Sequence, residues 1–256
     1  MYLIRGQNNI KLFKKRFPEI SLSATIGNFD GMHLGHKAIL EKVKKNAVEK
    51  NLSSLVIFTE PHAAEYFSKI NKSSPPPRII PWREKLRLIS KNGMDFCMLL
   101  KFDESLKSMT PEQFTGEILE ELQIKSLTIG DDFKFGKDRK GDHQYLKGWG
   151  ASMGIKIDKT DTIKVDDQRV SSTRIREALI SNNFKTANAM LDWHYSYSGK
   201  VVYGSQLGRE IGVPTANIWI PKQKLPISGV YAVRCMVNNA KYLGIANMGI
   251  RPTVGG

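Results

Sequence analysis

The sequence predicts an α/β fold with a parallel, doubly wound sheet, followed by a smaller antiparallel β-barrel. Over roughly the first 185 residues, short apolar runs alternate with stretches of helical periodicity, which is typical of a parallel sheet covered by helices. From about residue 191 helical periodicity stops and short β-rich runs follow one another, as in small barrels. We therefore expect two domains, residues 1–185 and 186–256.

Each element expected in the first domain follows from a local pattern. Continuous apolar runs predict strands buried on both faces, and apolar residues at helical spacing predict the helices between them. Thr110, Pro111 and Gln113 form a helix start, with a capping hydroxyl and a proline in the first turn. We expect strands over 23–26, 53–59, 96–102 and 126–130, and helices over 37–50, 82–90, 110–122 and from 170 onward. In such a sheet, ligands bind at the carboxyl ends of the strands.

The second domain is predicted from β-rich runs at the end of the chain. These runs lie at 198–203, 216–220, 230–237 and 242–246. The Asn-Asn-Ala-Lys segment between the last two runs fits a hairpin turn, so we expect antiparallel pairing.

The composition bounds the class of protein. A net charge of +14 suits nucleic acid or phosphorylated small molecules and does not choose between them. The hydrophobic fraction of 41% is enough for real cores, and no segment approaches a membrane span. No apolar stretch follows the basic residues Arg5 and Lys11–Arg16, so we expect no signal peptide and a cytoplasmic protein. Cys97 and Cys235 have neither metal-binding nor redox spacing.

The most informative segment is 23–36, where a β-rich run ends in glycine-rich turns and His33 and His36 precede a helix. Unpaired backbone N–H groups converge at a strand–loop–helix junction, where the helix dipole is positive, so this junction predicts an anion site. Two imidazoles there can bind a polyphosphate without the permanent charge of lysine. A P-loop does not fit, because His36 stands at its second glycine and Ala38 where Ser or Thr would hold magnesium.

A second polar segment, residues 130–142, comes directly after a predicted strand. It contains Asp132, Phe133 and Phe135 together with glycines and bases. The two aromatic rings either stack on a flat ligand or anchor the loop, and the sequence leaves both readings open.

A third polar segment, residues 170–177, opens the last helix of the first domain. Its hydroxyls can cap the helix, and it carries Arg174 and Arg176. Cations in a first turn oppose the helix dipole, and an anion nearby would resolve this conflict.

In order and spacing, these motifs resemble the bifunctional prokaryotic riboflavin kinase/FMN adenylyltransferase family, also called FAD synthetase. Residues 27–36, Gly-Asn-Phe-Asp-Gly-Met-His-Leu-Gly-His, match the G-x-F-D-x-x-H-x-G-H pattern of nucleotidyltransferases. Further matches lie at 60–62, 130–136, 171–176, 208–217, 229–231 and 247–253, so the resemblance covers nearly the whole chain. It implies a Rossmann-like nucleotidyltransferase domain followed by a riboflavin kinase-like barrel.

The resemblance implies that the first domain transfers AMP from ATP to FMN, giving FAD and pyrophosphate, with Mg²⁺ bridging the nucleotide phosphates. The catalytic residues would be Asn28, His33, His36 and Arg176, which hold the phosphates and stabilise the charge that develops on them. The ATP-binding residues would be Gly27, Phe29, Asp30, Gly35, Ser172 and Thr173. The flavin-binding residues would be Pro61, His62, Asp132, Phe133 and Phe135. Ala63 and Ala64 stand where the family carries proline and often arginine.

The resemblance also implies that the second domain phosphorylates riboflavin to FMN with ATP. Arg209 would bind ATP, and Thr215 and Asn217 would bind magnesium and ATP phosphate. The family continues past the position of Gly256 with further barrel strands, a glutamate base and a closing helix. We therefore expect an incomplete barrel, and little or no riboflavin kinase activity in a protein that ends at this residue.

Two other functions remain open from the sequence. The two-histidine site would also serve a nucleotidyltransferase with a different phosphorylated acceptor, such as phosphopantetheine or a nicotinate nucleotide. The positive charge and the histidine motif also suit an RNA-binding module, but no basic stretch is interleaved with aromatic residues. We expect small-molecule nucleotides and flavins as partners, with no nucleic acid and no membrane, and the oligomeric state stays open.

Overall fold

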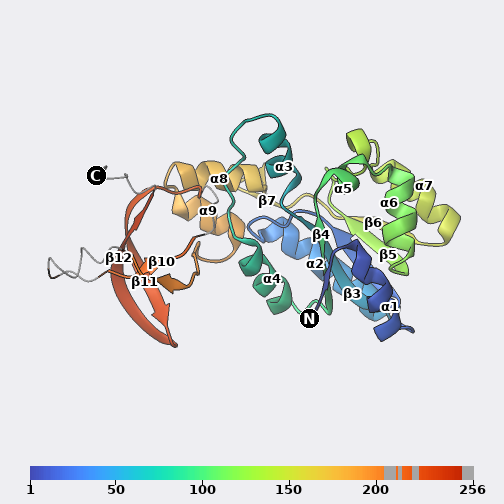
Figure 1. The fold of residues 1–256 in the computed structure, drawn as a ribbon, viewed down its shortest axis with the longest axis horizontal. Coiled ribbons are helices and arrows are strands. Elements are labelled where there is room, and N and C mark those ends of the chain that lie inside the picture. Colours follow the sequence, from blue (N-terminus) through green and yellow to red (C-terminus); the bar gives the residue numbers. More distant parts are fainter. Residues whose placement is uncertain (205–211, 213–214, 221–224, 250–256) are drawn as a thin grey trace.

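The computed structural model describes residues 1–204, 212, 215–220 and 225–249. Its larger part is built on a six-stranded sheet in the order β1-β4-β3-β2-β5-β6 (Figure 1). These strands are β1 (Tyr2–Arg5), β2 (Leu22–Ile26), β3 (Ser53–Glu60), β4 (Phe96–Lys101), β5 (Ile124–Ile129) and β6 (Lys156–Lys159). Every neighbouring pair in the sheet runs parallel, which confirms the predicted fold class.

Helices cover both faces of this sheet. They are α1 (Ile10–Arg16), α2 (Leu34–Glu49), α3 (Ala63–Ile70), α4 (Trp82–Lys91), α5 (Glu104–Ser108), α6 (Pro111–Phe114), α7 (His143–Met153), α8 (Ser172–Ile180) and α9 (Phe184–Leu191). A π-helical turn, Thr115–Glu120, extends α6, whose capping box is formed by Thr110 and Gln113 as the sequence predicts.

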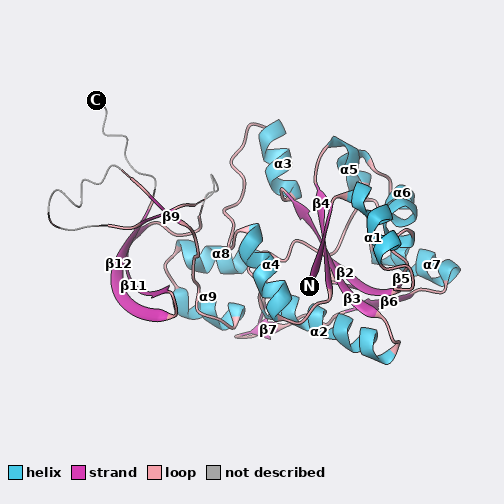
Figure 2. Cartoon of the chain, turned by 60° about the horizontal axis from the view of Figure 1, so that its bottom comes forward, coloured by secondary structure: helices cyan, strands magenta, loops and turns pink. Residues whose placement is uncertain are grey.

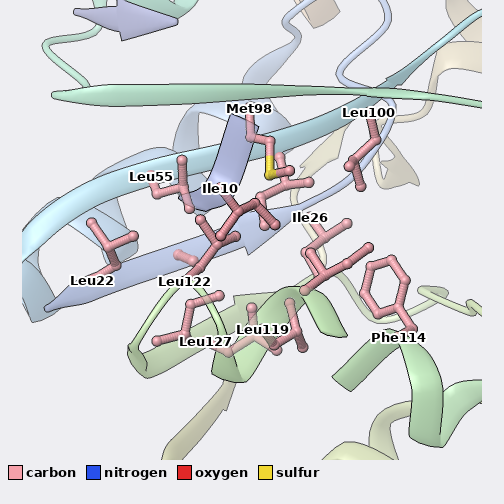
Figure 3. Close-up of a cluster of buried hydrophobic side chains, with 14 of the residues drawn as sticks. Ile10, Leu22, Ile26, Leu55, Met98, Leu100, Phe114, Leu119, Leu122 and Leu127 are labelled. Atoms are coloured by element: carbon pink, nitrogen blue, oxygen red, sulfur yellow. The ribbon is translucent and has the colours of Figure 1, made fainter. Parts of the chain in front are cut away.

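The alternating side chains of the strands divide the interior into two cores. Leu55 and Ile57 of β3 point into one core, together with residues of α1, α6 and the π-helical turn (Figure 3). Val56 and Phe58 point into the other core, which is shared with α2, α4, α8 and α9. Because both faces of β3 are covered, its sequence is an apolar run without alternation.

The strand order reverses beside β2. From β2 the chain proceeds to β3 and β4 on one side, whereas β5 and β6 lie on the other side. In an open parallel sheet this topological switch point forms a crevice at the carboxyl ends of the strands. The loops after β2 and β5 therefore meet where the fold favours ligand binding.

The C-terminal part consists of antiparallel pairs in the described residues. β9 (Val201–Val202) pairs with β10 (Asn217–Ile218), and β11 (Gly229–Val237) pairs with β12 (Ala240–Met248). Figure 2 shows β11 and β12 as a strongly curved ribbon. Its turn residues Asn238 and Asn239 have φ of 48° and 67°, as a tight hairpin requires, so the predicted turn is confirmed.

The two parts of the chain meet at α8 and α9. The Tyr231 hydroxyl of β11 lies 2.7 Å from Asn182 Oδ1, and its ring lies edge-on to Phe184 with centroids 5.6 Å apart. The buried residues of α9 belong to the second core of the parallel-sheet part. The domain division predicted after residue 185 falls inside this helix.

Candidate active site

The loop between β2 and α2 has an unusual backbone. Phe29 and Met32 have φ of 49° and 44°, and non-glycine residues in this left-handed region are enriched at functional sites. Gly31 between them has φ of 86°, and a Cβ atom there would lie 3.0 Å from Ile79 Cδ1. The loop thus turns sharply enough to bring His33 to the N-terminus of α2.

His33 and His36 form a stacked pair at this helix start. Their ring centroids are 3.6 Å apart with an interplanar angle of 18°. His33 Nδ1 accepts the backbone N–H of His36 at 3.4 Å, so the proton of the neutral ring lies on Nε2. His36 Nδ1 is buried and has no hydrogen-bond partner among the described residues. The pair therefore includes a polar ring atom, His36 Nδ1, that no other group in the described part of the chain binds.

Both imidazoles are neutral at neutral pH. Burial, reinforced by Arg169 and Arg176, lowers the pKa of His33 from 6.5 to about 4. Burial, with His33 and Lys85 nearby, also lowers the pKa of His36 well below its usual value. A neutral imidazole N–H can donate a hydrogen bond to an anion without adding positive charge at the N-terminus of α2.

Asp30 joins this loop to α8. Its fully buried carboxylate accepts the backbone N–H groups of Ile79 and Ile80, each at 3.2 Å, and the Nη2 of Arg176 at 2.7 Å. The Ser172 hydroxyl donates to the Asp30 backbone carbonyl at 2.9 Å. The acceptors of Asp30 are thereby used within the protein, so this residue organises the loop.

The other predicted phosphate-binding residues surround the same junction. Asn28 is exposed, and Phe29 is buried with its ring centroid 5.0 Å from that of His36. At Gly35 a Cβ atom would lie 3.2 Å from the ring of His33. Thr173 is exposed in the first turn of α8. The structure thus gathers these residues from two segments far apart in sequence.

A buried ion network, which the sequence did not predict, lies behind the loop. Arg78, which is 2% exposed, binds both carboxylate oxygens of Glu60 at 2.7 and 2.8 Å and also binds Glu65. The Pro77 carbonyl accepts the Nε of Arg176 at 2.8 Å. Residues 77–80 therefore connect three parts of the fold, which are the β2–α2 loop, the end of β3 and α8.

His62, predicted at the flavin side, is buried at the start of α3, directly after Pro61. Its Nε2 lies 3.0 Å from the Nζ of Lys85, a residue that the sequence did not predict at this site. Burial, Lys85 and the nearby arginines lower the pKa of His62, so it stays neutral. Helical periodicity could have predicted that Lys85 is buried, because it lies on the apolar stripe of α4 with Trp82 and Ile89.

The two aromatic residues in the loop after β5 differ in how deeply they are buried. Phe135 is 8% exposed and packs against Phe114 and Tyr145, with centroids 5.1 and 5.8 Å apart, so it anchors the loop. Phe133 is only partly buried and stacks on Phe135 at 5.6 Å. Asp132 is exposed beside Arg169, at 3.3 Å. Of the three residues predicted in this loop, Phe133 and Asp132 are accessible and Phe135 is buried.

The residues predicted for the second site lie in the C-terminal part. Thr215 and Asn217 are exposed at the start of β10 and make no hydrogen bond to the first site in the described part of the chain. Arg209 lies outside the described residues. No group of three or more His, Cys, Asp or Glu that could hold a metal ion is present in the described residues. Nor is any helix in the described ranges long and apolar enough to cross a membrane.

The parallel sheet with its helices is a Rossmann-like nucleotidyltransferase fold, and the stacked histidines lie at its switch point. Residues 18–174 match the sequence model of FAD synthetase, and residues 191–256 match that of riboflavin kinase. The bifunctional riboflavin kinase/FMN adenylyltransferase of Escherichia coli (strain K12) is 39% identical over 258 residues, covering 100% of this chain and 80% of that protein. The Haemophilus influenzae protein of the same name is 38% identical, covering 100% and 81%. The chain belongs to the bifunctional riboflavin kinase/FMN adenylyltransferase family.

A solved structure supports the same fold. The chain described as a macrolide-efflux protein from Streptococcus pneumoniae aligns with a TM-score of 0.76 at 26% identity. The alignment covers 99% of this chain and 81% of that one. The arrangement of both parts is therefore shared by a relative of low sequence identity.

Proposed function

We propose that this protein makes FAD, by transferring AMP from ATP to FMN in its first part and by phosphorylating riboflavin to FMN with ATP in its second part. The observation that carries the first activity is the neutral, stacked pair of His33 and His36 at the N-terminus of α2. The matches to both family models and the bifunctional relatives support the two activities together. The two units divide near residue 185, around α9.

In adenylyl transfer, a phosphate oxygen of FMN attacks the α-phosphorus of ATP, and the bond from this phosphorus to the pyrophosphate oxygen breaks. Negative charge grows on the leaving pyrophosphate. The Nε2–H of His33, a ring nitrogen of His36 and the N-terminus of α2 stabilise this charge. Asn28 adds a polar group at the exposed edge of the loop. The protein acts mainly by positioning and electrostatics.

Arg176 completes the phosphate site from α8. Its Nε and Nη2 are bound to Pro77 and Asp30, while its Nη1 has no hydrogen bond within the described residues. The guanidinium is thus fixed in place and retains donors for the α- or β-phosphate. Thr173 and Ser172 lie in the first turn of the same helix, and Gly27 and Gly35 belong to the proposed ATP site at the β2–α2 junction.

Magnesium enters as the MgATP substrate. The Asp30 carboxylate is already filled by two N–H groups and Arg176, so the metal is held mainly by phosphate oxygens and water. FMN binds beside Pro61 and His62, against Phe133 and Asp132. In the kinase unit, Thr215 and Asn217 offer oxygen ligands to MgATP, and Arg209 contacts the nucleotide.

The test is a chromatographic assay of purified protein with ATP and magnesium, given FMN in one reaction and riboflavin in another. FAD from FMN, and FMN or FAD from riboflavin, would support both activities. FAD from FMN alone would leave only the adenylyltransferase, and no product in either reaction would overturn the proposal. We further propose a cytoplasmic enzyme with no nucleic-acid or membrane partner.

The rival functions are tested with other phosphorylated acceptors in the same assay and with a separate RNA-binding measurement. Adenylylation of phosphopantetheine or nicotinate mononucleotide, but not of FMN, would show a nucleotidyltransferase with another acceptor. RNA binding that is tight, sequence-selective and only weakly salt-dependent would favour the RNA-binding module.

A further inference from the structure

Lys85 is a buried cation without a carboxylate partner. It lies on α4, its side chain is fully buried, and no Asp or Glu lies within ion-pair distance in the described residues. Lysine is almost never fully buried unless its charge is compensated. We therefore expect the Lys85 ammonium to have hydrogen-bond acceptors other than a carboxylate.

Three such acceptors surround the ammonium group. Lys85 Nζ lies 2.5 Å from the backbone carbonyl of Asn28 and 3.0 Å from His62 Nε2. It also lies 4.5 Å from the ring centroid of Phe58, within the range of a cation–π interaction. The three N–H donors of the ammonium thus have a carbonyl, an imidazole nitrogen and an aromatic face.

Two of these acceptors belong to different parts of the candidate site. Asn28 lies in the β2–α2 loop that carries the histidine pair, and His62 begins α3 on the proposed flavin side. We propose that Lys85 is a positioning residue that ties these two turns together and holds His62 in the tautomer protonated at Nδ1. The neutral imidazole in water prefers the proton on Nε2, so this tautomer is a specific consequence of the contact.

The charged groups around Lys85 do not neutralise it. Asp30 and Glu60 favour the ammonium, but their own carboxylates are bound by Arg176 and Arg78. Arg78 itself disfavours the ammonium, and Cys97 and His36 are the other titratable neighbours. Burial is the largest cause and lowers the pKa of Lys85 to about 8. As the pH rises through this value, the Lys85 ammonium loses a proton and its contacts with Asn28 and His62 weaken.

The direct test is ¹⁵N NMR of the histidine-labelled 256-residue chain, with His62 assigned by a His62→Gln variant. In the unaltered protein at pH 7 we expect Nδ1 protonated and Nε2 unprotonated. In Lys85→Met the His62 ring should revert to the Nε2-protonated form, whereas Lys91→Met, an exposed lysine on the same helix, should change nothing. Protonated Nε2 in the unaltered protein would overturn the proposal.

The kinetic test rests on the proposed FMN adenylyltransferase activity. We expect Lys85→Met to lower kcat by about 10- to 100-fold, because small displacements of positioned groups have effects of this size, with a smaller change in the KM for ATP. Lys85→Arg, charged at all accessible pH, should recover part of kcat and shift the alkaline decline of activity upward. A lower Tm with unchanged kcat would overturn the positioning role. Absence of FAD formation by the unaltered protein would instead count against the proposed function. The NMR result would still test whether Lys85 holds His62 in the Nδ1-protonated tautomer.

Discussion

The guanidinium of Arg176 lies 2.7 Å from the carboxylate of Asp30, although 146 residues separate them. The pair joins α8, at its fifth residue, to the loop that positions the histidine pair. A cation in the first turn opposes the dipole of its helix, and the sequence predicted an anion to resolve this conflict. The Asp30 carboxylate is such an anion, and a bound phosphate would compensate the charge of Arg176 further.

Replacing Asp30 with asparagine should destabilise the protein and impair its activity. Asp30 is fully buried and Arg176 is 18% exposed, so removing one charge leaves the other uncompensated, at a cost of about 3–5 kcal/mol. Urea unfolding measures this cost. Asp192→Asn is the matched control, because Asp192 pairs with Lys37 while 63% exposed, and should change stability by less than about 1 kcal/mol. Equal effects of the two variants would contradict the importance of the buried pair.

The pH dependence of stability should report the neutral state of His33. Its folded-state pKa of about 4 lies below the ordinary 6.5, so between these values the unfolded chain binds a proton that the folded chain lacks. The neutral His33 therefore contributes roughly 3 kcal/mol to the free energy of unfolding above pH 6.5, and this contribution is lost as the pH falls through 4. Urea unfolding between pH 7 and 4 should therefore show a flatter slope in His33→Gln. The exposed His194→Gln should keep the original slope, and the absence of a difference between these two variants would argue against a buried neutral imidazole.

Truncation of the histidine pair should act on the chemical step. His33→Ala and His36→Ala should each lower kcat for FAD formation by roughly 100- to 1000-fold, the usual effect of removing a donor that stabilises developing charge. KM for ATP should change less, because the α2 N-terminus remains. His143→Ala, at the start of α7, serves as the control and should retain full activity. Changes in KM alone would show that the pair serves binding and not the reaction.

The sheet could be predicted from the sequence because its central strands are local patterns. The runs at 53–59 and 96–102 are apolar enough to mark strands covered on both faces, and they correspond to β3 and β4. The sequence did not predict the edge strands β1 and β6 or the helices α1, α3, α5, α7 and α9. β1, for example, has four residues and pairs with β4, which is distant in sequence. Local periodicity carries no information on such a pairing.

The site could be predicted only where a motif is continuous in sequence. The segment 27–36 showed the histidines and the helix start, but not that Asp30 faces Arg176. Lys85 was missed because a lysine on a helix is ordinarily solvated, and only the packing of α4 buries it. For Phe133 and Phe135 the sequence left stacking and anchoring open, and the packing around each ring divides the two roles.

The two aromatic residues after β5 should respond differently to truncation. Phe135→Ala removes a core side chain and should cost about 3–5 kcal/mol in urea unfolding. Phe133→Ala should change stability less and raise the KM for FMN by roughly 5-fold, the value of one aromatic stacking contact. A KM effect from Phe135→Ala at full stability would reverse this assignment.

Gly31 should tolerate no side chain, because two independent constraints act on it. Its φ of 86° is strained for alanine, and a Cβ atom would lie 3.0 Å from Ile79 and 3.3 Å from Leu191. Gly31→Ala should therefore destabilise the protein by about 1–3 kcal/mol and displace His33, with loss of FAD formation. Gly148→Ala is the matched control, since Gly148 lies inside α7 with no atom within 4 Å of the added Cβ. This control should stabilise by about 0.5–1 kcal/mol. Unchanged stability and activity in Gly31→Ala would mean that the loop relaxes freely, and that its backbone does not determine where the histidines lie.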